Sequence, residues 1–417
     1  MRAQGRLLPP QEARALLARI GREGETDLLR RHLDSALAGV ASPLVPGNRV
    51  ELLVDGPQTH ESMFAAIRAA RDHVNLQSYI ISADEVGQEL ATLLRSKREQ
   101  GVRVNLLYDS AGGRDTPKEY FDGLRDADIA VCEFNPIDPT KTRGAWRINN
   151  RNHRKLLIVD GAVAFTGGIN ISGVYSAGSF GSGTRSPSRG WRDTHARFEG
   201  PVATEAQRLF VDAWRSQRHC DKLEEAHYFP EVAPRGTRVV RLVASAPDYG
   251  SETYATLLSA LEHAERRAYL TYGYFAPDER MLEAIKAAAQ RGVDVQLVLP
   301  GFSDFWAPLA AGQSHYDALL ESGVRIHERT DALLHAKTAV IDGVWSTVGS
   351  TNLDWRSFVH NYEADLMVLS EDFGKALEEL FAADVAHSQE IRLEAWRNRG
   401  LRQRLKEWFA RQWEYWL

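Results

Sequence analysis

The chain has 417 residues, a length that allows two domains, each with its own buried core. Its apolar fraction of 43% and charged fraction of 26% are typical of a water-soluble globular protein. The net charge of −5 and the isoelectric point of about 6.3 do not indicate a nucleic acid as a partner, and we expect none.

The first 45 residues precede everything that repeats in the chain, and we expect them to form a helical leader. They lack the uninterrupted apolar core and the small-residue cleavage site of a secretory signal. No stretch of the chain approaches the run of about 18 apolar residues needed to cross a bilayer. We therefore expect a protein that stays in the cytosol and contacts membranes only from their surface.

Two long segments, residues 46–232 and 233–390, contain the same order of predicted elements. Each has a helix followed by an apolar strand, a second helix that ends at a glycine, a β-rich run, a short helix and a further strand. The paired segments are 61–73 with 252–267, then the strands starting at Val74 and Ala268, and the helices ending at Gly101 and Gly292. Strands that alternate with helices predict an α/β domain, here present twice.

Each repeat ends in one pattern: His-x-Lys, four residues, Asp, six residues, Gly, two residues, Asn. The two copies consist of His153, Lys155, Asp160, Gly167 and Asn170, and of His335, Lys337, Asp342, Gly349 and Asn352. Five positions that recur at identical spacing, 182 residues apart, indicate a shared functional site rather than ordinary half-buried histidines.

The spacing within the pattern has a physical meaning. Residues i and i+2 of a strand point to the same side, so each histidine projects beside a lysine. A lysine repels a cation, which argues against a metal site, and we expect neither a metal nor another cofactor. Asp160 lies five residues beyond Lys155, roughly 17 Å along an extended strand. We therefore expect Asp160 and Asp342 to organise the Asp-Gly turns that follow.

The repeated pattern resembles the HKD motif of the phospholipase D superfamily. The resemblance implies two pseudo-twofold-related α/β domains, each a mixed β-sheet flanked by helices, that share one active site at their interface. It also implies that both aspartates of the motifs, Asp160 and Asp342, count with the histidines and lysines as catalytic residues. The segment LHAKTAVIDGVWSTVGSTNLDWRSF, followed by NYEADLMV, is similar to bacterial cardiolipin synthases of the short form without N-terminal membrane spans.

A phosphodiester is a slow electrophile, and a histidine that attacks it divides one difficult displacement into two easier ones through a phosphohistidine. The other histidine can protonate the leaving alkoxide and later deprotonate the acceptor. The resemblance favours His153 as the nucleophile and His335 as the acid and base. Lys155 and Lys337, with Asn170 and Asn352, are expected to bind the phosphoryl oxygens.

A nucleophilic imidazole needs its other nitrogen held by an acceptor. Asp193 and Glu363 are the candidates, because each lies on the strand after its motif and the resemblance supports the role. Many relatives carry a glutamate where this chain has Gln77, so one expected carboxylate is missing near the site.

The resemblance implies transfer of a phosphatidyl group to phosphatidylglycerol, with phosphatidylglycerol and phosphatidylethanolamine both open as donors. A hydrolytic phospholipase D remains an alternative, and a superfamily nuclease or a scaffold without catalysis is less favoured. Such an enzyme is expected at the cytoplasmic face of the bacterial inner membrane, as a peripheral protein. The sequence predicts no oligomeric state.

Residues 391–417 form a basic tail with seven arginines and lysines against three glutamates. On a helix, Leu401, Leu405, Trp408, Phe409 and Trp416 gather on one side. Aromatic and cationic side chains on such a helix suit an anionic membrane surface, although the same side chains would also suit packing on the protein's own core.

Two further features of the sequence lead to smaller expectations. The glycine- and serine-rich segment 178–190 is interpreted as a surface loop, with a lid over the lipid site as the alternative. Cys132 and Cys220 are too few for a disulfide framework and lack metal-ligand spacing, so we expect two buried or inert thiols.

Overall fold

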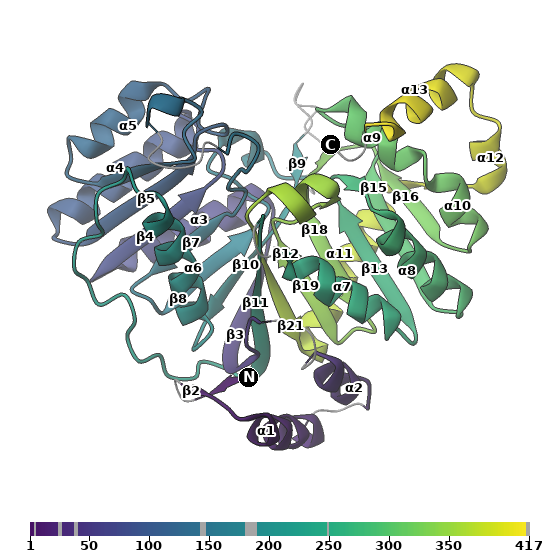
Figure 1. The fold of residues 1–417 in the computed structure, drawn as a ribbon, viewed down its shortest axis with the longest axis horizontal. Helices are drawn as coiled ribbons and strands as arrows, with labels where there is room; N and C mark the ends of the chain where they lie inside the picture. The colour runs from purple at the N-terminus through teal and green to yellow at the C-terminus, as the bar shows by residue number, and fades with distance from the viewer. Residues whose placement is uncertain are drawn as a thin grey trace.

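The structure is a computed structural model that describes residues 1–3, 6–23, 27–36, 41–141, 147–179, 190–247 and 250–413. Its centre is one 16-stranded sheet that runs through both repeats (Figure 1). The first repeat contributes seven strands, in the spatial order β3 (Val45–Val54), β10 (Thr194–Glu199), β8 (Val163–Gly167), β7 (Leu156–Val159), β4 (His73–Ser78), β5 (Arg103–Asp109) and β6 (Ala130–Phe134).

The second repeat continues the sheet from the other side of β3. Its strands follow in the order β11 (Arg238–Ala246), β21 (Glu363–Leu369), β19 (Trp345–Gly349), β18 (Lys337–Ile341), β13 (Arg267–Tyr272), β15 (Asp294–Pro300), β16 (Arg325–Arg329) and β22 (Ser388–Ile391). A short strand, β12 (Gly250–Ser251), pairs with β11. The antiparallel pair β3–β11 forms the seam between the repeats. From this seam outward, the strands of both repeats occur in the same relative order.

Strand directions, which the sequence left open, follow one rule in both repeats. The three outer strands β4, β5 and β6 are parallel, as are β13, β15 and β16. The inner strands pair antiparallel with their neighbours. The sheet is therefore mixed, and the predicted α/β class with two repeats is confirmed.

Helices cover both faces of the sheet. In the first repeat α3 (Asp55–Ala69), α4 (Glu85–Glu99) and α5 (Lys118–Arg125) share one apolar core, and α6 (Ala203–Ser216) covers the other face. The second repeat places α7 (Glu252–Glu262), α8 (Glu279–Gln290) and α10 (Tyr316–Glu321) on one core and α11 (Glu371–Ala386) on the opposite face. Gly101 and Gly292 follow α4 and α8 with φ of +84° and +91°, the left-handed conformation that ends a helix and favours glycine.

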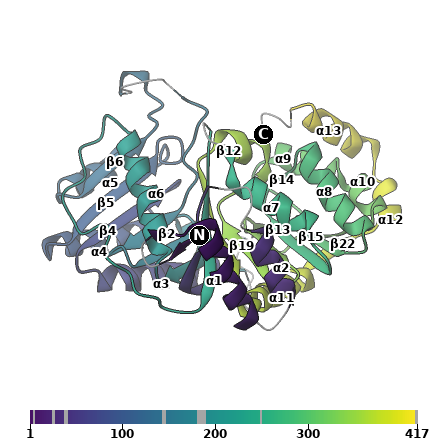
Figure 2. The ribbon, with the colours of Figure 1, turned by 60° about the horizontal axis from the view of Figure 1, so that its bottom comes forward.

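The N-terminal segment contains two short paired strands, β1 (Arg2–Ala3) and β2 (Arg6–Leu7), and the helices α1 (Pro10–Glu23) and α2 (Asp27–Ser35). Both helices lie on the side of the molecule opposite β9, at the bottom of Figure 1 and toward the viewer in Figure 2. Leu28, Leu29 and Leu33 of α2 join the core of the second repeat. The leader is thus packed against the second repeat rather than separate from it.

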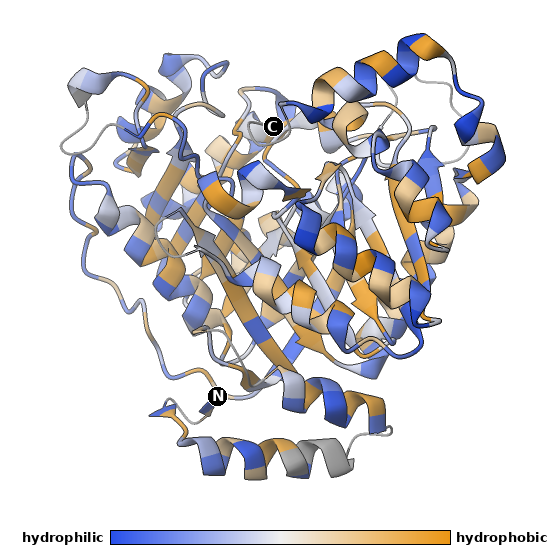
Figure 3. Cartoon of the chain, turned by 45° about the vertical axis from the view of Figure 1, so that its right-hand side comes forward, coloured by the Kyte–Doolittle hydropathy of each residue, from blue (hydrophilic) through white to orange (hydrophobic). Residues whose placement is uncertain are grey.

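After β22 the chain forms α12 (Leu393–Arg397) and α13 (Leu401–Arg411), and α13 packs along α9 (Trp306–Gln313). Figure 3 shows that hydrophilic and hydrophobic residues alternate along α13. Its buried face carries Glu407 and Ala410, so its larger apolar side chains point outward. These outward side chains and two residues at the start of α9 form what we call the aromatic surface. Its members are 45 to 76% exposed: Phe305, Trp306, Leu401, Leu405, Trp408, Phe409 and Trp413. No helix in the described residues is long and apolar enough to span a bilayer.

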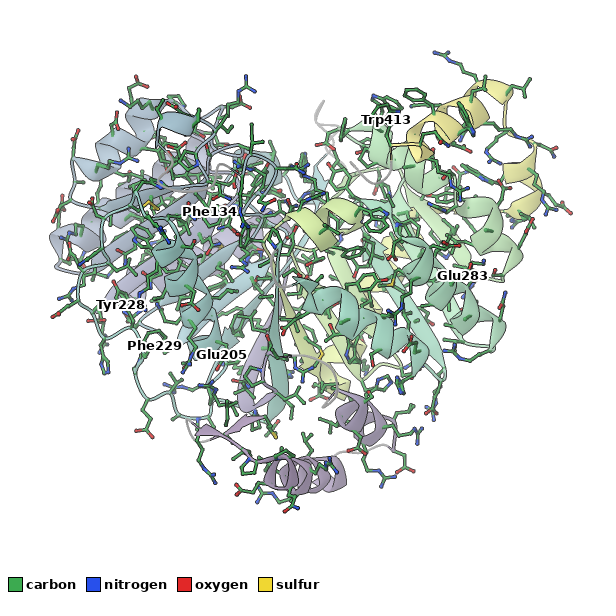
Figure 4. The ribbon with its side chains drawn as sticks, in the orientation of Figure 1. Phe134, Glu205, Tyr228, Phe229, Glu283 and Trp413 are labelled. Atoms are coloured by element: carbon green, nitrogen blue, oxygen red, sulfur yellow. A yellow bond between two sulfur atoms is a disulfide. The ribbon has the colours of Figure 1, made fainter. Side chains whose placement is uncertain are left out.

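Cys132 and Cys220 form a disulfide, so the prediction of two thiols was wrong. Cys132 lies on β6, the strand that also carries Phe134, which is labelled in Figure 4, and Cys220 follows α6. The two sulfurs meet because α6 crosses the sheet and returns the chain to its outer edge. The cysteines are 88 residues apart in the sequence, so their closeness in space could not be read from it. His219 lies beside them, but sulfurs joined to each other are not the thiolates that a metal would need.

Candidate active site

Each motif histidine is held in place by backbone from the opposite repeat. The amide N–H of His153 donates to the carbonyl of Tyr362 at 2.9 Å, and that of His335 donates to the carbonyl of Arg192 at 2.8 Å. The second contact continues a short parallel pairing of β17 (Leu333–Leu334) with β9 (Trp191–Arg192). In both cases the accepting residue immediately precedes one of the two candidate carboxylates.

As a result, the two histidine–carboxylate pairs cross the interface. His153 Nδ1 lies 3.0 and 3.1 Å from the two carboxylate oxygens of Glu363, and His335 Nδ1 lies 2.7 Å from Asp193 Oδ2. Both carboxylates are fully buried, whereas the histidine side chains keep 12 and 8% of their exposure. Because Nδ1 is the bonded nitrogen in each ring, Nε2 is the nitrogen available for chemistry.

The two lysines lie on the same side as the histidines, as the i, i+2 spacing predicts. Lys155 Nζ donates to the carbonyl of His153 at 2.7 Å, and Lys337 Nζ donates to the carbonyl of His335. Burial lowers the pKa of Lys155 to about 7 and that of Lys337 to about 8. The charge of Lys337 also lowers the pKa of Lys155, so the two motifs meet in one place.

Burial also lowers the pKa of both histidines. The pKa of His335 is lowered further by the charges of Lys337, Lys155 and His153, while the Glu363 carboxylate opposes the fall for His153. Four groups that can carry a positive charge therefore share one buried site. A bound phosphodiester anion would relieve their mutual repulsion and raise all four pKa values.

Asp160 and Asp342 lie at the turns and not among these groups. Asp160 accepts hydrogen bonds from the backbone N–H groups of Arg71, Asp72 and His73, at the start of β4. Asp342 accepts the equivalent three from residues 265–267 and a fourth from His32 Nε2 at 2.9 Å. Both aspartates have positive φ, 51° and 56°. In the described residues neither carboxylate contacts a motif histidine, so the structure gives them turn contacts and no catalytic one.

The two asparagines are not equivalent in their contacts. Asn170 accepts from the backbone N–H of Ile80 at 3.1 Å and donates to the Tyr175 hydroxyl at 3.1 Å, so its amide is largely engaged. Asn352 Oδ1 is buried without a hydrogen-bond partner in the described part of the chain. Gln77 donates to Asn152 Oδ1 at 2.7 Å, directly before His153, and supports the motif backbone without a carboxylate.

Several groups around the site were not singled out from the sequence. The ring of Tyr79 lies 5.1 Å from that of His153, and the ring of Trp191 lies 5.3 Å from that of His335. Ser350 Oγ donates to Glu363 Oε2 at 2.6 Å. Tyr79 follows Gln77 by two residues, directly after β4 ends, a spacing that could have identified it. Trp191 and Ser350 carry no comparable signal.

The doubled His-x-Lys site between two halves of one sheet defines a phospholipase D-type protein. The family model "Cardiolipin synthase, PLD-like domain" matches residues 63–176 and 257–385, more than half of the chain. A cardiolipin synthase of Listeria monocytogenes is 34% identical over 370 residues, 88% of this chain and 75% of the relative. Cardiolipin synthase A of Pseudomonas fluorescens is 36% identical over 355 residues, 84% of this chain and 71% of the relative. The chain belongs to this cardiolipin synthase family.

Two solved structures share the fold at low sequence identity. Phosphatidylserine synthase from Haemophilus influenzae superposes with a TM-score of 0.67 over 92% of this chain and 97% of its own, at 14% identity. Polyphosphate kinase from Porphyromonas gingivalis has a TM-score of 0.52 over 89% of this chain and 53% of its own, at 11% identity. At these identities the likeness concerns the fold alone.

Proposed function

We propose that this chain transfers a phosphatidyl group from a donor phospholipid to phosphatidylglycerol and so forms cardiolipin through a phosphohistidine. The observation that carries the proposal is the pair of histidine–carboxylate contacts across the interface, with a buried lysine beside each histidine. The relatives named cardiolipin synthase cover most of the chain and give the reaction its substrate class.

In the first step Nε2 of His153 attacks the phosphorus of the donor. A nitrogen–phosphorus bond forms, the bond from phosphorus to the headgroup oxygen breaks, and its electron pair leaves with that oxygen. His335 gives the oxygen its proton, and the headgroup alcohol departs. Glu363 holds Nδ1–H of His153 and stabilises the positive charge that develops on the ring.

In the second step the terminal hydroxyl of phosphatidylglycerol attacks the phosphohistidine. Its proton passes to Nε2 of His335, its oxygen bonds to phosphorus, and the nitrogen–phosphorus bond breaks. His153 and His335 return to their starting states, so neither an oxidant nor any other co-reactant is consumed. Lys155 and Lys337 neutralise the oxygens around phosphorus in both displacements, a task given to metal ions in many phosphotransferases.

A hydrolytic phospholipase D differs only in the use of water for the second step. We favour transfer because the matched relatives are named for synthesis. To test it, the purified chain is incubated with phosphatidylglycerol vesicles in EDTA and the lipids are analysed by mass spectrometry, with His153→Ala as the control. Cardiolipin and free glycerol, absent with the variant, are the expected products. Phosphatidic acid alone would assign the hydrolase, and cleavage of DNA without lipid turnover would assign a nuclease.

We also propose that the aromatic surface binds an anionic membrane. Leu401, Leu405 and Trp408 follow one another at i, i+4 and i+7 and are exposed, so the alternative of packing on the protein's own core does not apply to them. Arg402 and Lys406 lie between these residues, and the Lys406 ammonium is 5.1 Å from the Trp306 ring. Apolar rings next to cations suit the boundary between headgroups and acyl chains. Trp416 lies outside the described residues.

The test of this surface is vesicle flotation. Replacing Leu405 and Trp408 by serine should lower binding to phosphatidylglycerol vesicles about tenfold or more, because both side chains would enter the acyl boundary. As a control for the loss of positive charge away from this surface, Arg325 on β16 and Arg392, which precedes α12, are both replaced by alanine. Undiminished binding of the Leu405 and Trp408 variant would refute the proposal.

For location we propose the cytoplasmic face of the membrane, where phospholipid synthesis takes its substrates. The disulfide is an opposing observation, since disulfides persist mainly in oxidising compartments. Alkylation of the two cysteines in intact cells decides between the faces. Free thiols support the cytoplasmic face, and a disulfide in the living cell favours the outer one.

A further inference from the structure

Joining two phospholipids brings two phosphodiesters into one site, and only one of them reacts. The donor has a single phosphate, which the proposed mechanism puts between Lys155 and Lys337. The phosphate of the acceptor does not react and is linked to the attacking hydroxyl through a three-carbon glycerol. Because an unpaired phosphate is costly away from bulk water, the acceptor requires a cation of its own near His153.

Most arginines near the motifs are buried and already held by protein partners. Arg151 is buried and contacts Asp109, the carbonyl of Asn135 and the carbonyl of Arg147. Arg154 is buried and donates to the carbonyls of Glu363 and Ser245. The buried Arg192 and Arg329 both pair with Asp384. None of these guanidinium groups is free to turn toward a lipid.

Arg356 differs from all of them. It is half-buried, and among the described residues its guanidinium has one hydrogen bond, to the neutral Oδ1 of Asn149 at 3.3 Å, and no ion pair with a carboxylate. It opens a π-helical turn, Arg356–His360, a form of helix that often occurs at functional sites. A cation with a single weak neutral partner is ready to accept an anion.

The position of Arg356 relates it to His153. The carbonyl of Arg356 accepts the N–H of Asn361, and the amide of Asn361 reaches Glu363, the carboxylate of the His153 pair. Its partner Asn149 belongs to the segment that leads into His153. The charge of Arg356 also acts on the hydroxyl of Tyr79, where it opposes the rise in pKa that burial causes, and the Tyr79 ring lies against His153.

We propose that Arg356 binds the non-reacting phosphodiester of the acceptor phospholipid and thereby selects a phospholipid over water or a simple alcohol in the second step. This inference rests on the proposed phosphatidyl transfer and names the residue that recognises its acceptor. A guanidinium suits the task because its planar fork can donate two parallel hydrogen bonds to one phosphate, which a lysine cannot do.

The test compares two acceptors with one donor. Mixed micelles of phosphatidylglycerol are incubated with isotopically labelled glycerol, and both cardiolipin and labelled phosphatidylglycerol are measured. Forming labelled phosphatidylglycerol requires the phosphohistidine but no second phosphate. Arg356→Ala should lower the ratio of cardiolipin to labelled phosphatidylglycerol about tenfold or more, with the loss expressed as a higher KM for phosphatidylglycerol as acceptor. Arg356→Lys should recover part of the ratio.

Arg68→Ala, an exposed position on α3, is the matched control and should leave the ratio unchanged. An equal fall of both products in Arg356→Ala would show a structural role, and an unchanged ratio would show no role; either result overturns the inference. A wild-type chain that exchanges glycerol but makes no cardiolipin would instead refute the proposed function, so the two failures are distinguishable.

Discussion

The two halves of the active site have the same backbone plan but stabilise their histidines differently. The Glu363 carboxylate receives hydrogen bonds from His153, Ser350 and Asn361, and its pKa is lowered, chiefly by the charge of His153 against the effect of burial. Asp193 contacts His335 and the backbone N–H of Thr194, and burial raises its pKa. One histidine therefore has a firmly ionised partner, and the other has a carboxylate that is easier to protonate.

A single motif position explains much of this difference. Gly168 of the first motif corresponds to Ser350 of the second. A β-carbon at Gly168 would come within 2.1 Å of Asp193 Oδ1, so the short carboxylate fits only beside a glycine. In the second motif the serine hydroxyl becomes a donor to the longer Glu363. The asymmetry suits a nucleophile at His153, whose ring gains positive charge, and a proton carrier at His335.

The largest effect on activity should come from replacing each motif histidine singly by alanine. His153→Ala and His335→Ala should each lower cardiolipin formation by about 10³-fold or more. With a donor whose leaving group needs no proton, such as a p-nitrophenyl phosphodiester, His335→Ala should still release one equivalent of nitrophenol in a burst, and His153→Ala should release none. The reverse pattern would move the nucleophile to His335.

Replacing the carboxylates by their amides sharpens the same comparison. Glu363→Gln should reduce kcat by about 10³-fold, because the variant loses the negative charge of a carboxylate whose lowered pKa keeps it ionised. Asp193→Asn should cost only about 10- to 100-fold, since the pKa of Asp193 is already raised. Steady-state kinetics on both variants measures the difference. Equal losses would remove the asymmetry, and full activity of Asp193→Asn would end its role in orienting His335.

The outer edges of the halves also differ, and this difference concerns stability. In the first repeat the edge strand β6 is fixed by the disulfide, whereas in the second β22 pairs with β16. Cys220→Ser should lower the free energy of unfolding by about 2–4 kcal/mol, because the unfolded chain regains the freedom of an 88-residue loop. Denaturant unfolding with and without a reductant measures it. A variant whose unfolding midpoint matches the oxidised wild type would contradict this expectation.

The smallest effect concerns pH. Anion binding needs protonated lysines, and burial lowers the pKa of Lys155 to about 7 and that of Lys337 to about 8. Their charge is lost as the pH rises, so kcat/KM should fall above about pH 7. Lys155→Arg keeps its charge and should shift this fall upward by about one pH unit, whereas Lys337→Arg should shift it less. Profiles of both variants that superimpose on the wild type after scaling would exclude lysine titration as the cause.

Much of this arrangement could be predicted from the sequence because it is repeated. Two copies of a pattern identify His153 and His335 together, and the strand period explains why a lysine accompanies each. The crossing of the pairs, His153 with Glu363 and His335 with Asp193, could not be predicted, since it depends on how the halves face each other. The disulfide and the contribution of Trp306 to the aromatic surface depend on tertiary packing in the same way.

The seam between β3 and β11 has a consequence for any attempt to produce one half alone. Cutting the chain between the repeats would uncover the paired part of this seam, where Val45 and Asn48 of β3 face Val240 and Arg238 of β11. A strand edge that loses its partner pairs readily with whatever strand is available. Separate fragments are thus expected to associate with each other, or with copies of themselves, before they persist as monomers.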